Sequence, residues 1–167
     1  MNKFDSIRYV FFDIDGVLSA PVFLSDGKQV SGFSDNDWVR ANIEGYAYKD
    51  CIAPKLSKDF VKALDILGKR LFCLTTETFS FAYLNKVRFI TENYPEFKDK
   101  QDILYVLEDA KKITLIKEIA KRDNLRLSEC LLVEDTLNTI LLAEKEGIRT
   151  MHISQLLNWE GLDVETT

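Results

Sequence analysis

Two aspartates, Asp13 and Asp15, have the type and spacing best suited to chemistry in this sequence of 167 residues. They follow an apolar run at residues 8–12, and one residue separates them. Side chains at every second position of an extended chain point to the same side, so the two carboxylates begin together. Gly16 then allows the backbone to turn away. Two neighbouring carboxylates repel each other and require a cation, which a simple Asx turn at a strand end does not explain.

Further polar side chains that could take part in chemistry stand where predicted strands end or a predicted helix begins: Thr75, Thr76, Lys111, Lys112, Glu134 and Asp135. Each has a structural explanation, because a hydroxyl or a carboxylate can cap a helix and lysines are commonly solvated. A cation at a helix N-terminus opposes the helix dipole, which leaves a functional role for one lysine and two solvated lysines as equal alternatives. Adjacent carboxylates after a buried strand suit Mg²⁺, which binds oxygen ligands and retains waters.

Short apolar runs alternate with amphipathic stretches along the chain and would position these side chains. The runs predicted to be strands are residues 8–12, 70–75, 102–107, 130–133 and 148–153. The stretches predicted to be helices are 57–67, 79–93, 112–123 and 136–146. Near-continuous apolar strands suit a sheet buried on both faces. The order predicts an α/β fold with a doubly wound, mostly parallel five-stranded sheet, helices on both faces, and ligands at the carboxyl ends of the strands.

The length favours a single domain, residues 1–167, with an insert at about 19–56 after the first strand. Two extended runs around Asp26-Gly27 predict a β-hairpin over residues 22–33. A short helix over 35–46 is expected to follow. The insert is too small to form an independent domain.

Composition excludes several classes of function. The net charge of −5 gives no reason to expect a nucleic-acid partner. No apolar run approaches the roughly 20 residues that a membrane helix needs, so no membrane partner is expected. The three cysteines, Cys51, Cys73 and Cys130, are odd in number and far apart, which predicts free thiols and a reducing cytoplasm.

Together, these segments resemble the haloacid dehalogenase (HAD) superfamily. The family's first motif, D-x-D-G-[VT]-[LV], is matched by residues 13–18. The resemblance implies that Asp13 attacks phosphorus and forms an aspartyl-phosphate. It also implies that Asp15 protonates the leaving oxygen and then activates water. Phosphatases and phosphomutases of the family carry this second aspartate.

The resemblance also assigns phosphate contacts. Thr75 matches the hydroxyl that binds phosphoryl oxygens, and Thr76 stands beside it where the family often has Asn. The family expects a lysine at the start of the helix at 112–123, to neutralise the nucleophile and the phosphate. Lys112 is preferred over Lys111 because its spacing to the last motif is usual for the family.

The implied cofactor is Mg²⁺. Its expected ligands are Asp13, the backbone carbonyl of Asp15 and Asp135, with Glu134 as a further ligand or a support behind the ligands. The family's last motif often ends in an acid, and this chain has Thr139 there. His152, the only histidine, lies in the last predicted strand and is expected to be structural.

The favoured function is therefore a phosphatase that acts on a small phosphorylated metabolite. A phosphomutase for a sugar phosphate stays open, because that branch of the family also has Glu-Asp in its last motif. An inactive binding or regulatory module stays open as well, because Thr76 and Thr139 depart from the family pattern. The predicted hairpin resembles the flap of the capless branch, which includes the 3-deoxy-D-manno-octulosonate 8-phosphate phosphatases. Members of that branch often close the site with a neighbouring subunit, so a homo-oligomer is an open expectation.

Overall fold

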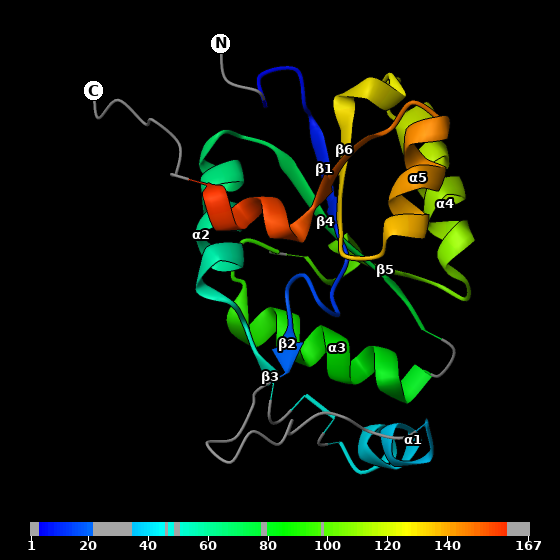
Figure 1. Cartoon of the computed structure of the whole chain (residues 1–167). Coiled ribbons are helices and arrows are strands. Elements are labelled where there is room, and N and C mark those ends of the chain that lie inside the picture. Colours follow the sequence, from blue (N-terminus) through cyan, green and yellow to red (C-terminus); the bar gives the residue numbers. More distant parts are fainter. Residues whose placement is uncertain are drawn as a thin grey trace.

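The computed structural model describes residues 4–21, 35–45, 47–48, 51–77, 80–97 and 99–159. Its centre is a parallel sheet with the strand order β5-β4-β1-β6-β7 (Figure 1). The strands are β1 (Tyr9–Phe12), β4 (Arg70–Thr76), β5 (Ile103–Val106), β6 (Cys130–Glu134) and β7 (Arg149–His152). Because β1 is central and later strands are added on both sides of it, the predicted doubly wound five-stranded sheet is confirmed.

Helices cover both faces of this sheet, as predicted (Figure 1). They are α2 (Lys55–Ile66), α3 (Ser80–Asn93), α4 (Asp109–Arg122) and α5 (Leu137–Lys145). Since side chains alternate along a strand, Phe12 of β1 packs in the core under α2 and α3, whereas Phe11 packs under α4 and α5. The described residues also form three short 3-10 helices: η1 (Lys100–Asp102), η2 (Leu127–Glu129) and η3 (Ile153–Asn158).

Two helices begin earlier than the sequence predicts. Helix α4 begins at Asp109 instead of residue 112, because a carboxylate in the first turn is favourable beside the positive end of the helix dipole. Lys112 therefore lies one turn inside the helix. Helix α2 begins directly after Pro54, whose fixed φ is compatible with the residue before a helix.

The insert begins and ends with two short paired strands. Strand β2 (Ala20–Pro21) pairs antiparallel with β3 (Cys51–Ile52), and α1 (Asp35–Ile43) lies between them in sequence. All three lie beyond the carboxyl ends of the central strands (Figure 1). Helix α1 falls within the helix predicted for 35–46, whereas the hairpin predicted for 22–33 lies outside the described residues. The division into one domain with an insert at about 19–56 stays a prediction.

None of the three cysteines forms a disulfide, as expected from the sequence. Cys73 and Cys130 are buried in β4 and β6, and Cys51 is half-buried in β3. Among the described helices, none has the length and apolar character required to cross a bilayer.

Candidate active site

Asp13 directly follows β1 and points into the interior at the carboxyl edge of the sheet. Its backbone N–H donates to the carbonyl of Val133 at 3.0 Å, which continues the pairing of β1 with β6. Only 6% of the residue is exposed. Burial raises the pKa of Asp13 to about 7, although the nearby Lys112 ammonium lowers it. The ionised carboxylate therefore needs more positive charge than Lys112 alone provides.

Lys112 is the cation beside this carboxylate. Its Nζ lies 2.7 Å from Oδ1 of Asp13 and 2.9 Å from Oε2 of Glu134. Burial opposes the ammonium charge, but the two carboxylates outweigh it and raise the pKa of Lys112. Lys111 is exposed on the same helix. Lys112, and not Lys111, therefore lies beside the Asp13 carboxylate, where a cation is expected from the sequence.

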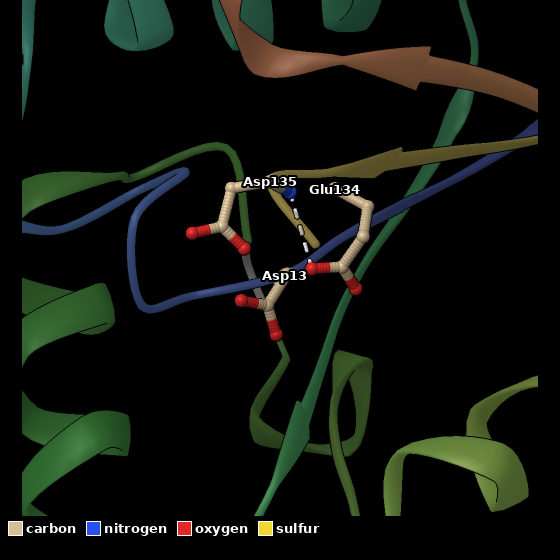
Figure 2. Close-up of side chains that lie close together, drawn as sticks. All are labelled: Asp13, Glu134 and Asp135. Carbon is tan, nitrogen blue, oxygen red and sulfur yellow. Dashed lines mark hydrogen bonds between the residues drawn. The ribbon is translucent and has the colours of Figure 1, made fainter. Parts of the chain in front are cut away.

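Figure 2 shows the carboxylates of Asp13, Glu134 and Asp135 gathered at the ends of β1 and β6. One oxygen from each lies within 4.8 Å of the others. Both oxygens of Glu134 are already engaged: Oε1 accepts from the N–H groups of Asp135 (3.1 Å) and Thr136 (3.2 Å), and Oε2 contacts Lys112. Glu134 is therefore better placed to support the other ligands than to bind a metal itself.

Gly16 is required where the backbone passes Asp135. Its φ of +82° is a left-handed conformation that other residues rarely adopt. A Cβ at this position would lie 2.1 Å from Oδ2 of Asp135. Only glycine therefore permits the turn after Asp15 and the close approach of the Asp135 carboxylate.

This group of donors fits a hard divalent cation. Three carboxylates lie together and the ammonium of Lys112 pairs with two of them, Asp13 and Glu134, while burial keeps the pKa of Asp13 raised. Oxygen donors without sulfur or imidazole favour Mg²⁺ over zinc. Asp13, Asp135 and the backbone carbonyl of Asp15 are the residues that could hold it.

Asp15 lies between two donors that sequence analysis missed. The hydroxyl of Tyr48 donates to Oδ1 of Asp15 at 2.7 Å, and Nζ of Lys86 lies 2.8 Å from Oδ2. The hydroxyl of Ser19 lies 3.4 Å from Oδ1. Tyr48 comes from the predicted insert and Lys86 from α3, and neither stands in a recognisable motif. A lysine in the apolar stripe of α3 was the one signal available.

The two threonines at the end of β4 have different surroundings. Thr75 is buried, and its Oγ1 accepts a hydrogen bond from Lys86 at 2.8 Å. The hydroxyl of Thr76 contacts the carboxylate of Asp109, while its carbonyl accepts from Lys86 at 2.9 Å. Thr75 thus lies near Asp15 through a shared partner, and Thr76 is linked to the first turn of α4.

His152 supports the turn that carries Asp135. The N–H of Ser154 donates to Nδ1 of His152 at 3.2 Å, so Nε2 carries the hydrogen and donates to the carbonyl of Asp135 at 3.0 Å. These contacts agree with the structural role expected for this histidine. Thr139, where the family often has an acid, is buried in α5 and supplies no charge.

No protein-family model matches the sequence, and no curated protein sequence matches it. Solved structures do match. A haloacid dehalogenase-like family protein, SP0104 from Streptococcus pneumoniae, superposes with a TM-score of 0.55 at 18% identity, over 93% of this chain and 92% of that one. HAD family enzyme bt-2542 from Bacteroides thetaiotaomicron, in complex with magnesium and inorganic phosphate, gives 0.54 at 16% identity, over 87% and 93%.

A third similar structure is the cobalt-bound deoxy-D-mannose-octulosonate 8-phosphate phosphatase from Haemophilus influenzae. Its TM-score is 0.53 at 16% identity, over 90% of this chain and 71% of that one. The chain spans just under two thirds, 65%, of another match, hypothetical protein XCC2798 from Xanthomonas campestris. At these identities the likeness concerns the fold. The chain therefore has the fold of the haloacid dehalogenase (HAD) superfamily.

Proposed function

We propose that this chain is a Mg²⁺-dependent phosphohydrolase that cleaves a phosphomonoester of a small metabolite through a phosphorylated Asp13. One observation carries the proposal. The buried carboxylate of Asp13 lies 2.7 Å from the Lys112 ammonium and within metal-ligand reach of Asp135, and a second aspartate follows two residues later. The matched bt-2542 structure, which contains magnesium and inorganic phosphate, supports it.

In the first step, a carboxylate oxygen of Asp13 attacks phosphorus, and the bond between phosphorus and the leaving oxygen breaks. Asp15 donates a proton to that oxygen, which departs as an alcohol. Lys112 stabilises charge on the phosphoryl group, and the hydroxyl of Thr75 donates to a phosphoryl oxygen. Mg²⁺ held by Asp13, Asp135 and the carbonyl of Asp15 would supply the positive charge that the buried carboxylate and the phosphate require.

In the second step, Asp15 accepts a proton from water while the water oxygen attacks phosphorus. The bond between phosphorus and Asp13 breaks, which releases inorganic phosphate and restores the carboxylate. Glu134 and His152 take no direct part: the first holds Lys112, and the second holds the carbonyl of Asp135.

The test is hydrolysis of p-nitrophenyl phosphate by the purified chain with Mg²⁺, compared with Asp13→Asn. We expect the variant to lose essentially all activity. Equal rates for the two proteins would contradict the proposal and favour a binding module. A panel of phosphorylated metabolites would then identify the substrate, and release of an isomeric sugar phosphate without free phosphate would favour a phosphomutase.

Two further proposals concern the cellular location and the oligomeric state of the chain. The absence of a disulfide among the three cysteines fits a reducing compartment, so we propose a cytoplasmic location. Assembly into a homo-oligomer stays a prediction, to be measured by the mass of the chain in solution.

A further inference from the structure

Lys86 lies on a face of α3 that is otherwise apolar. It stands between Ala82 and Ile90 at spacings of four residues, and all three are buried. Only 3% of the lysine side chain is exposed. A buried ammonium is unfavourable unless hydrogen bonds and opposite charge surround it. Its partners therefore indicate what the position does.

The ammonium of Lys86 joins two segments of the candidate active site. It has three N–H donors and three close acceptors: Oδ2 of Asp15 at 2.8 Å, Oγ1 of Thr75 at 2.8 Å and the carbonyl of Thr76 at 2.9 Å. Oε2 of Glu77 lies 3.4 Å away and adds a second negative charge. Lys86 thus connects the turn after β1 to the end of β4.

These contacts fix the orientation of both side chains. An ammonium only donates, so Oγ1 of Thr75 must accept from Lys86, and the hydroxyl hydrogen of Thr75 must point elsewhere. That hydrogen is then available to a phosphoryl oxygen. On Asp15, Lys86 occupies Oδ2 while Tyr48 occupies Oδ1, so the carboxylate is held from both sides.

We propose that Lys86 is a positioning residue of the phosphoryl-transfer site. It holds the carboxylate of Asp15 and the hydroxyl of Thr75 in a fixed relative position. Lys86 differs from Lys112, which contacts Asp13 directly. The proposal rests on the proposed phosphohydrolase function, because it gives Lys86 a role through the acid/base and phosphate-binding residues of that reaction.

The first test uses Lys86→Met, which keeps much of the side-chain length and removes the charge. We expect kcat for phenyl phosphate to fall about ten- to a hundredfold, the usual loss when a group that orients a functional residue is removed, with KM little changed. The loss should be smaller for p-nitrophenyl phosphate, whose better leaving group needs less help from Asp15. In an Asp15→Asn background, Lys86→Met should cost clearly less than it does alone.

A matched control is Lys117→Met, which removes an exposed lysine of α4 paired with Glu146 and should leave kcat unchanged. If Lys86→Met does not fold, Lys86→Gln is measured in its place, because it retains hydrogen-bond donors without charge. Two results would overturn the proposal. In the first, the losses of kcat from Lys86→Met and Asp15→Asn multiply in the double variant, as for residues that act independently. In the second, Lys86→Met raises KM and leaves kcat constant, as for a residue that only binds substrate.

The second test does not depend on turnover. In a crystal structure of Lys86→Met we expect the carboxylate of Asp15 to leave the place that it occupies in wild type between Tyr48 and Lys86. An unmoved Asp15 would refute the positioning role even if the wild-type chain were inactive. Failure of the phosphohydrolase function itself is a different result, in which the wild-type chain is no faster than Asp13→Asn.

Discussion

Replacing Asp13 with Asn should change stability and activity in opposite directions. Burial raises the pKa of Asp13 to about 7 from the ordinary 3.8. Between these values the folded chain binds a proton that the unfolded chain has lost, so the metal-free protein loses stability as the pH rises from about 4 to about 7. At about 1.4 kcal/mol per pKa unit, ionisation of Asp13 lowers the free energy of unfolding by at most about 4 kcal/mol. Less than half of this loss is present at about pH 5.

Asn has nearly the same shape and no charge, so Asp13→Asn removes this cost. In EDTA at about pH 8, we expect the variant to melt up to roughly 8 to 16 °C above wild type, at about 2 to 4 °C per kcal/mol for a domain of this size. The difference should shrink at about pH 5. Excess MgCl₂ should raise the melting temperature of wild type more at the higher pH and raise that of the variant much less.

Asp135→Asn is the matched control. It removes a second candidate metal ligand, but its carboxylate is exposed, so it should lose the response to Mg²⁺ without gaining stability in EDTA. An Asp13→Asn protein that melts below wild type at both pH values would refute the reasoning. The pair between Asp13 and Lys112 would then stabilise the fold by more than the burial of the carboxylate costs.

Three further predictions concern neighbouring positions. Gly16→Ala should destabilise the fold by more than the 1 to 2 kcal/mol typical of a left-handed residue and abolish the Mg²⁺ response, because its Cβ would meet Asp135. Gly147→Ala, with similar φ and open space, should show only that backbone cost in a denaturant titration. Lys112→Met should lower kcat about a hundredfold, through loss of one preorganised donor, in a phosphate-release assay. Tyr48→Phe should lower kcat for phenyl phosphate about three- to tenfold with KM unchanged, because Asp15 loses one of its hydrogen bonds.

The fold could be predicted because its main signals are local. Each central strand is a short apolar run, and each main helix follows one with an amphipathic pattern. The positions of Asp13, Thr75 and Asp135 follow from this order, since the carboxyl ends of parallel strands meet at one edge. The start of α4 was misplaced because the carboxylate of Asp109 was not counted as a favourable first-turn residue.

The support around Asp15 could not be predicted for a different reason. Its contacts with Tyr48 and Lys86 join segments far apart in the chain, and neither partner has a motif. A lysine on a helix is ordinarily solvated, so only the packing of α3 against the sheet shows that Lys86 is buried. Thr139 also stands where the family often has an acid, and Glu134 places its charge against Lys112 from the end of β6.

The two aspartates of the first motif thus have unlike environments although one residue separates them. Asp13 is buried with one ammonium beside it, and burial raises its pKa to about 7 although that ammonium lowers it. Asp15 is half-exposed, and Lys86 and Tyr48 occupy its two oxygens. Different environments are what allow paired carboxylates to take different roles. A bound cation would therefore help to balance the charge of the proposed nucleophile, whereas the proposed acid/base is held in place by the protein's own side chains.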